Sequence, residues 1–342
     1  MAALAESEPL TPIDIQRRDL LSSDVRIEIE FSGICHSDIH TVRGDWGARP
    51  YPVVPGHEII GRVVEVGDRA SKHKVGDRVG VGVIVDSCRT CDKCLQGLEN
   101  YCETATFTFG HPDPHMPGLF TYGGYSSSIV VTEDFVYSIP DGLDPAAAAP
   151  LLCAGITVYS PLRHWNVGPG MTVGVAGIGG LGHLAVKFAA AMGAKVVALT
   201  SSEKKRELAK KLGAHDVLIT SDEEQMSAWA NSFDLIISTL PGNHDMNPYL
   251  QLLGLDGTYV VVGALDDMTF DLNLRMLVAR RRSIAGSMIG GLPETQEMLD
   301  FCGKHNITAE IELISADGIN AAYDRVVSGD VLGRFVIDAS TI

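Results

Sequence analysis

Apolar and polar positions follow a short period through the first 140 residues. Residues 25–31 alternate apolar and polar side chains, as a strand with one buried face does. Residues 58–66 and 78–85 are rich in β-branched side chains and are set off by glycines, a pattern typical of a barrel with tight turns. Residues 109–124 have no period and are rich in Gly, Pro and His, which predicts a long surface loop. The N-terminal part is therefore predicted to be β-rich.

The pattern changes after about residue 153, where short apolar runs alternate with helical stretches. Residues 203–212 form one helical stretch, and Gly213 follows it in the position of a helix C-cap. Six apolar runs joined by crossover helices predict a doubly wound, six-stranded parallel sheet. These runs are residues 172–176, 195–200, 216–220, 234–239, 258–262 and 283–287.

The tail, from about Gly291, does not extend this alternation. It contains one helical stretch, residues 294–302, and ends in the apolar run 335–337. A chain of 342 residues exceeds what one hydrophobic core usually serves, so we expect two domains in an α/β protein. The expected domains are residues 1–152, completed by residues 291–342, and residues 153–290.

A glycine-rich segment follows the run 172–176 and opens a helix that extends to Met192. Such a segment allows a tight turn, lets backbone N–H groups approach a pyrophosphate and places the start of a helix against its negative charge. The strand–turn–helix context therefore predicts a dinucleotide site. The glycines expected to contact the dinucleotide are Gly177, Gly179, Gly180 and Gly182.

The end of the second strand indicates which dinucleotide binds. An NAD enzyme usually carries Asp or Glu about 20 residues beyond the glycines, but this chain has Ser201 and Ser202 there, followed by Lys205 and Arg206. Hydroxyls and cations would bind a 2′-phosphate, so NADP(H) is predicted. Glu203 opposes this interpretation, and a solvated helix start is the alternative.

Four of the seven cysteines fall within fifteen residues. In a reducing compartment this crowding indicates metal binding rather than disulfides. Four thiolates close the coordination of a tetrahedral zinc ion, which predicts a structural site. The four are Cys88, Cys91, Cys94 and Cys102, whereas Cys302 stands alone and is expected to fill a small apolar space.

A second set of possible ligands is dispersed, and consists of Cys35, His57 and Cys153. Two thiolates and an imidazole leave a fourth position for water or a substrate oxygen, which is the known donor set of the catalytic zinc in alcohol dehydrogenases. Glu58 is close enough to His57 to bind the same ion when substrate is absent. The spacing alone leaves these residues equally open to an interpretation as buried structural cysteines.

The composition of the chain limits which partners it can bind and in which cellular compartment we expect it. The net charge of −16 argues against nucleic acid, whose phosphates require clustered Lys and Arg. No apolar run approaches the roughly 18 residues of a membrane helix, and the first ten residues lack the order of a signal peptide. We therefore expect a cytoplasmic protein without a membrane partner.

These motifs resemble the zinc-containing medium-chain alcohol dehydrogenases, most closely the cinnamyl alcohol dehydrogenase branch. The resemblance implies a GroES-like β-rich catalytic domain, completed by the tail, joined to a Rossmann domain. It also implies that Cys35, His57 and Cys153 hold a catalytic zinc and that the four-cysteine set holds a structural one, giving two zinc ions per chain. The motifs that carry it are residues 33–40, 54–58, 88–102, 150–157, 177–182 and 294–302.

The resemblance further implies roles for residues around the metal. Ser37 and His40 would form a proton relay, and Asp38 would orient His57. Thr157 would lie beside the nicotinamide, and members of this branch are commonly homodimers. The positions that match an aromatic and apolar substrate wall, suited to aryl or medium-length aldehydes, are Trp46, Phe107, Met288 and Ile289. Residues 104–122 differ in length and sequence from the corresponding segment of the plant members of this branch, so the resemblance does not extend to the identity of the substrate.

Three other classes of protein are considered. A zinc-free quinone or enoyl reductase of the same superfamily lacks both ligand sets. A non-enzymatic zinc module is opposed by the acidic charge and by the nucleotide motif. An NAD-dependent zinc polyol or secondary-alcohol dehydrogenase is the nearest alternative, but it usually lacks the four-cysteine lobe. We therefore predict a zinc-dependent, NADP(H)-preferring alcohol dehydrogenase or aldehyde reductase.

Overall fold

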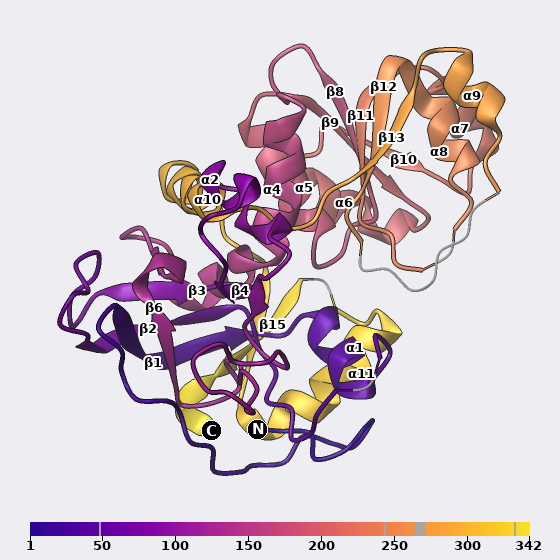
Figure 1. Cartoon of the computed structure of the whole chain (residues 1–342). Helices are drawn as coiled ribbons and strands as arrows, with labels where there is room; N and C mark the ends of the chain where they lie inside the picture. Colours follow the sequence, from indigo (N-terminus) through magenta and orange to yellow (C-terminus); the bar gives the residue numbers. More distant parts are fainter. Residues whose placement is uncertain (48, 243, 264–270, 332) are drawn as a thin grey trace. The chain divides into compact units, whose positions relative to one another are not determined.

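The computed structural model describes residues 1–47, 49–242, 244–263, 271–331 and 333–342 (Figure 1). Within these ranges the chain forms two compact units. The first contains Met1–Ile156 together with Gly290–Ile342, and the second contains Thr157–Ile289. Helix α4 (Ala154–His164) crosses the first boundary, which lies after Ile156 rather than after the expected Leu152.

The first unit is built on a largely antiparallel sheet around strand β1 (Asp24–Gly33), whose inward side chains are buried. The neighbouring strands are β2 (Ile59–Val66), β3 (Arg78–Val81), β6 (Ser128–Thr132), β7 (Tyr137–Ser138), β14 (Ile311–Ile314) and β15 (Arg334–Asp338). The described strands follow the order β14-β15-β1-β2-β3-β7, and β6 also pairs with β1. The tail returns to this unit, because β15 pairs with the end of β1 in the register Gly33 to Val336.

The β-branched run of residues 78–85 forms two strands rather than one. β3 ends at Val81, and a separate strand β4 (Ile84–Asp86) pairs with β5 (Thr106–Phe107). Between them the chain passes so close to another segment that a Cβ on Gly82 would lie 3.1 Å from the carbonyl oxygen of Leu152. Residues 109–124 form the expected loop, in which an isolated bridge joins Pro112 to Phe120.

Short helices complete the first unit. Helix α1 starts directly after β1 and packs beside α11, and both contribute to a core with the apolar side of β15. This packing fixes the turn between β1 and α1, which carries several of the predicted site residues. The helices are α1 (His36–Arg43), α2 (Asp92–Leu95), α3 (Pro145–Ala148), α10 (Leu292–His305) and α11 (Ile319–Ser328).

The second unit contains a parallel sheet with helices packed against it (Figure 1). Its strands are β8 (Thr172–Ala176), β9 (Lys195–Thr200), β10 (Asp216–Ile219), β11 (Phe233–Ser238), β12 (Leu253–Val261) and β13 (Ser283–Gly286). Among the described residues six strands follow the order β10-β9-β8-β11-β12-β13, and every pair is parallel. The predicted doubly wound fold is confirmed. The covering helices are α5 (Gly182–Ala191), α6 (Arg206–Lys211), α7 (Glu223–Ala228), α8 (Asn247–Leu252) and α9 (Leu274–Val278).

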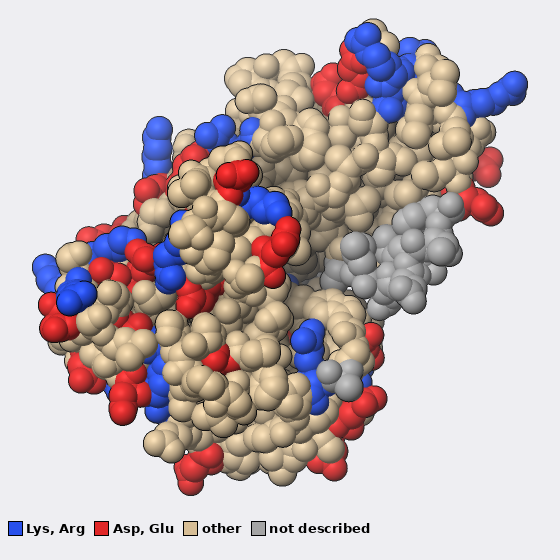
Figure 2. Space-filling view, viewed as in Figure 1, with Lys and Arg blue, Asp and Glu red and all other residues tan. Residues whose placement is uncertain are grey.

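The surface carries both signs of charge. On the face drawn in Figure 2, acidic side chains are interspersed with basic ones, and the whole chain has a net charge of −16. No single helix in the described ranges is long and apolar enough to cross a membrane. One bent pair, Pro145–Leu152 with Ala154–His164, passes the same test by length and composition.

Candidate functional site

The dispersed ligand set comes together in the first unit. Cys35 lies in the turn between β1 and α1, His57 and Glu58 precede β2, and Cys153 follows the 3-10 turn Ala149–Leu152. The antiparallel pairing of β1 with β2 brings the first two segments side by side. Sγ of Cys35 lies 3.9 Å from Sγ of Cys153, which lies 3.2 Å from Nε2 of His57. One ligand atom from each of these four buried residues falls within 4.8 Å of all the others.

This geometry fits a zinc ion. A Zn–S bond of about 2.3 Å gives a tetrahedron whose S···S edge is about 3.8 Å, and the separation of the two thiol sulfurs is 3.9 Å. Oε2 of Glu58 is buried and has no hydrogen-bond partner in the described part of the chain. Burying a carboxylate oxygen without a hydrogen-bond donor is unfavourable unless a cation binds to that oxygen. Cys35, His57, Cys153 and Glu58 could therefore hold a metal.

Asp38 joins the parts of this cluster and is fully buried. Its Oδ1 accepts the backbone N–H of Gly56 at 3.0 Å and lies 2.9 Å from Nδ1 of His57. Its Oδ2 accepts the backbone N–H of Cys35 at 2.8 Å and the hydroxyl of Tyr125 at 3.2 Å. Because one ring nitrogen of His57 is bound to Asp38, the other is directed toward the cysteine sulfur, as in metal-binding histidines generally.

Arg334, which the sequence analysis did not identify, completes the cluster from β15. Its guanidinium forms a buried ion pair with Glu58, and the side chain of Glu58 is fully buried. Gly33 is required beside this pair, because a Cβ there would lie 2.0 Å from Oε2 of Glu58. One signal in the sequence could have identified Arg334: it directly precedes the apolar run 335–337. A cation that is buried together with such a run requires a partner of opposite charge.

The ionisable groups of the cluster depend on one another. The hydrogen bond with Cys153 lowers the pKa of Cys35 well below its usual value, and the same contact raises the pKa of Cys153. Burial raises the pKa of Glu58 to about 8. Burial also lowers the pKa of His57, but the charges and hydrogen bonds of Asp38 and Cys35 together outweigh this and leave the pKa well above its usual value. A bound cation would favour both thiolates and release protons.

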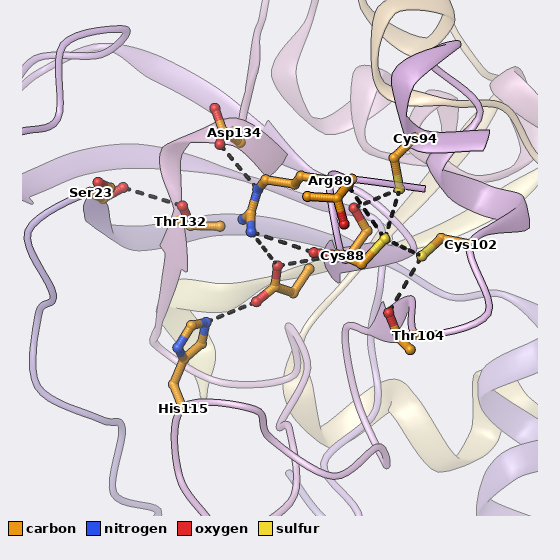
Figure 3. A network of polar contacts seen from close by, with 12 residues as sticks. Ser23, Cys88, Arg89, Cys94, Cys102, Thr104, His115, Thr132 and Asp134 are labelled. Carbon is orange, nitrogen blue, oxygen red and sulfur yellow. Dashed lines mark hydrogen bonds and ion pairs between the residues drawn. The ribbon is translucent and has the colours of Figure 1, made fainter. Parts of the chain in front are cut away.

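The four-cysteine lobe lies between β4 and β5 (Figure 3). Sγ of Cys88 lies 3.9 Å from Sγ of Cys94 and 3.6 Å from Sγ of Cys102, and Sγ of Cys91 lies 3.6 Å from Sγ of Cys94. These separations match the tetrahedral edge of about 3.8 Å. With four thiolates present, the lobe could bind zinc with no position left open for a substrate.

The two predicted relay residues, Ser37 and His40, lie on α1. Oγ of Ser37 lies 3.6 Å from Sγ of Cys35, so Ser37 borders the ligand cluster. Nδ1 of His40 lies 2.7 Å from Oδ2 of Asp45 instead, and its ring stacks on Trp46 at 5.0 Å between centroids. Within the described residues no hydrogen bond joins Ser37 to His40. A proton would need an intermediate carrier between them.

The residues predicted to form the substrate wall divide between the units. Trp46 and Phe107 belong to the first unit, where the ring of Phe107 lies 4.7 Å from that of His111. Phe109, which the sequence analysis did not identify, stacks on the ring of His57 with centroids 5.8 Å apart. The other two residues predicted for the wall, Met288 and Ile289, belong to the second unit, as does Thr157, which was predicted to lie beside the nicotinamide.

The glycine-rich segment forms the turn between β8 and α5. Gly177 has a φ of +87°, which favours glycine, and a Cβ on Gly182 would lie 1.8 Å from the carbonyl oxygen of Gly177. A Cβ on Gly179 would meet nothing within 4 Å, so the backbone there is open to a ligand, and Gly180 lies in the same turn. The hydroxyl of Thr239, a residue not predicted, donates to the carbonyl oxygen of Gly177 at 3.1 Å and supports the turn.

The predicted phosphate contacts lie directly after β9. The side chains of Ser201 and Ser202 are not fully buried, but the two cations already have partners. Nζ of Lys205 donates to the carbonyl oxygen of Ile178 at 2.9 Å. Arg206 donates twice to the carboxylate of Glu203, at 2.5 and 3.0 Å. A phosphate would therefore have to compete with Glu203 for Arg206.

Known proteins match both units. The family described as alcohol dehydrogenase GroES-like domain matches residues 22–141, and the family described as zinc-binding dehydrogenase matches residues 180–304. Aldehyde reductase YahK of Escherichia coli is 54% identical, with 100% of this chain and 98% of that protein covered. NADP-dependent alcohol dehydrogenase C 1 of Mycolicibacterium smegmatis is 54% identical, with 100% and 97% covered. The structure of a cinnamyl alcohol dehydrogenase from Sorghum bicolor superposes with a TM-score of 0.95 at 44% identity, with 99% and 96% covered.

A GroES-like unit, a parallel sheet with a glycine-rich turn and two clusters of zinc-ligand type together define a zinc-binding dehydrogenase. The chain belongs to the zinc-containing medium-chain alcohol dehydrogenases, in the cinnamyl alcohol dehydrogenase branch. The predicted family and fold class are both confirmed.

Proposed function

We propose that this protein is a zinc-dependent, NADP(H)-preferring alcohol dehydrogenase or aldehyde reductase that acts on aryl or medium-chain primary alcohols and aldehydes. The observation that carries this proposal is the buried cluster of Cys35, His57, Glu58 and Cys153, whose ligand atoms lie within 4.8 Å of one another. The names of the relatives, an aldehyde reductase and an NADP-dependent alcohol dehydrogenase, support the reaction class and the cofactor.

Two zinc ions would bind per chain. Cys35, His57 and Cys153 would hold the catalytic ion, with Glu58 able to replace a departing ligand, and the four-cysteine lobe would hold the structural one. When bound, the catalytic ion supplies Lewis acidity toward the substrate oxygen and the nicotinamide supplies hydride. Asp38 holds the imidazole of His57 in one orientation, and Arg334 holds the carboxylate of Glu58 beside the cluster.

The proton of the substrate hydroxyl would move through side chains of α1. Ser37 borders the cluster and is placed to exchange a proton with a substrate oxygen. His40 lies one turn further along the helix and is bound to the carboxylate of Asp45. Because no hydrogen bond of the described chain joins Ser37 to His40, the proton would cross between them through an intermediate carrier.

The dinucleotide would bind at the carboxyl ends of β8 and β9. The strand order changes direction beside β8, which is where ligands bind in open parallel sheets. The turn Gly177 to Gly182 would receive the pyrophosphate, and Thr157 would contact the nicotinamide. Ser201, Ser202, Lys205 and Arg206 would receive the 2′-phosphate.

Apolar side chains support proposals for the size of the substrate and for the assembly of the chain into a dimer. Trp46 and Phe107 would form one part of an apolar substrate wall, and Met288 and Ile289 another, which favours aryl and medium-length chains over small polyols. We also propose a homodimer, since the second unit exposes apolar side chains and its parallel sheet ends in an edge strand, β13. A cytoplasmic location would keep the seven cysteines reduced.

Steady-state kinetics over a panel of aldehydes and alcohols with NADPH and with NADH tests the proposal. We expect kcat/KM with NADPH to exceed that with NADH by roughly a hundredfold, the effect of two charge-assisted hydrogen bonds. Equal values for the two cofactors, or turnover confined to polyols with NADH, would contradict it.

A further inference from the structure

A chain of charged side chains connects the four-cysteine lobe with the loop of residues 109–124 (Figure 3). Nη1 of Arg89, which follows Cys88, lies 2.9 Å from Oδ1 of Asp86. The other oxygen of Asp86 lies 2.9 Å from Nε2 of His115, a residue of the loop. On its other side, Nε of Arg89 lies 3.2 Å from Oδ2 of Asp134. Asp86 is therefore the group through which the lobe reaches the loop.

The lobe end of this chain is firmly placed. Arg89 has a φ of +57° between two of the cysteines, and its guanidinium lies 5.1 Å from the centre of the Phe135 ring. The side chain of Asp86 is only 10% exposed, and its Oδ1 also accepts the backbone N–H of Ser87 at 2.8 Å. The carboxylate of Asp86 is thus shielded from solvent and fixed by two partners on the lobe side, although the side chain of Arg89 is 42% exposed.

The loop depends on this contact. Between Pro112 and Phe120 the described residues make no other hydrogen bond to the rest of the chain than that of His115 to Asp86. A cavity of about 50 Å³, lined in part by Asp86, His115 and Arg17, lies between this part of the loop and its surroundings. Without the contact, this part of the loop would keep no hydrogen bond to the rest of the described chain.

Movement of the loop would be transmitted to the ligand cluster. At the base of the loop, the N–H of Gly110 donates to Thr121 and the N–H of Thr121 donates to His111, at 2.9 and 2.7 Å. The hydroxyl of Thr121 also donates to the carbonyl oxygen of Phe107 at 2.9 Å. Phe109, within the same segment, stacks on His57. Phe109, which stacks on a residue of the cluster, and Phe107, whose carbonyl oxygen binds Thr121, are thus both attached to the loop.

We propose that Asp86 and His115 are positioning residues for the substrate wall: they fasten the 109–124 loop to the four-cysteine lobe and thereby hold Phe109 against His57 of the ligand cluster and Phe107 at the base of the loop. This rests on the proposed function, in which that wall binds an aldehyde. Large aryl substrates touch more of the wall than small ones, so their binding depends more on the position of the loop.

The principal test uses His115→Ala in the zinc-loaded protein, with two readouts. Hydrogen–deuterium exchange of a peptide covering residues 109–122 should become faster. The ratio of KM for cinnamaldehyde to KM for propanal should rise about three- to tenfold, the effect of one ordinary hydrogen bond, with a smaller change in kcat. His115→Gln, whose amide N–H can still donate to Asp86, should recover much of both effects.

Asp134→Asn is the matched control, because Asp134 also binds Arg89 but does not contact the loop. It should leave both the exchange of residues 109–122 and the KM ratio at their wild-type values. Unchanged exchange in His115→Ala, or an equal effect of Asp134→Asn, would overturn the proposal. Hydrogen–deuterium exchange of residues 109–122 could become faster in His115→Ala while the wild-type protein reduces neither aldehyde. That result would support the attachment of the loop to the lobe and contradict the proposed function.

Discussion

Asp38 is a buried carboxylate whose two oxygens contact four donor groups from three segments of the chain. Replacing it by Asn keeps the shape but places an N–H₂ group against donors, and leaving one such group unsatisfied costs about 1–3 kcal/mol. We expect Asp38→Asn to lose the catalytic zinc and to unfold at a lower temperature. Elemental analysis and thermal unfolding measure both effects. Asp45→Asn, which alters a half-exposed carboxylate on the same helix region, should keep the metal.

The two ligand sets should behave differently when one cysteine is removed. Cys153→Ser should reduce the zinc content from two ions to one and abolish nearly all turnover while the protein stays folded. Cys94→Ser should also lose one ion but should destabilise the chain, because the order of the lobe depends on its metal. Zinc analysis with denaturant unfolding tests this, and a single zinc ion in freshly prepared wild-type protein would contradict the assignment.

Ser37 and His40 should contribute unequally to turnover. Ser37→Ala should lower kcat by roughly a hundredfold, the usual scale for a positioned proton transfer, with zinc and cofactor affinity unchanged. His40→Gln should have a smaller effect, because His40 is hydrogen-bonded to Asp45 and solvent can replace the outer part of the relay. Wild-type turnover in zinc-loaded Ser37→Ala would show that Ser37 has no part in proton transfer.

At the scale of elements, the turn after β9 sets the balance between the two dinucleotides. Glu203 holds Arg206 through two hydrogen bonds, although its side chain is 65% exposed. Glu203→Gln should free Arg206 and raise the preference for NADPH over NADH by about two- to fivefold, as expected for one solvent-screened contact. Glu207→Gln removes the same charge without a hydrogen bond to Arg206 and should change little.

Ser201→Asp should lower the preference for NADPH over NADH. A carboxylate at the end of β9 would repel the 2′-phosphate and offer the ribose hydroxyls an acceptor. We expect the ratio of kcat/KM for the two cofactors to narrow or to reverse. An unchanged ratio would mean that Ser201 is only a turn residue.

At the scale of the whole molecule, the proposed dimer has a candidate surface in the second unit. β13 is an edge strand of the parallel sheet. Leu255, Leu274 and Val278 in the same unit are exposed by 65%, 63% and 83%. Exposed apolar side chains and an unpaired strand edge are each typical of an interaction surface. Val278→Asp should therefore shift the protein toward monomer in analytical ultracentrifugation. Val75→Asp, at a 61% exposed site of the first unit, should not; equal masses for wild type and Val278→Asp would contradict this surface.

Much of the fold could be predicted because the relevant signals are local. The six apolar runs of the second unit and the glycine-rich turn lie where the parallel strands and the start of α5 are found. Strand ends differed by up to several residues, as at β12, which begins at Leu253 rather than at Thr258. A periodic pattern specifies which side chains are buried, but where a strand ends depends on its neighbours.

The sequence by itself therefore determined the parallel sheet, the dinucleotide turn and the grouping of the four cysteines, since each depends on residues within one short stretch. Only the tertiary structure decided that Cys35, His57 and Cys153 meet, that Arg334 pairs with Glu58, and that His40 binds Asp45 rather than Ser37. These contacts join segments through strand pairing or depend on how side chains orient. The physical reason is that spacing along the chain records local periodicity, whereas ion pairs and metal sites depend on distances in space.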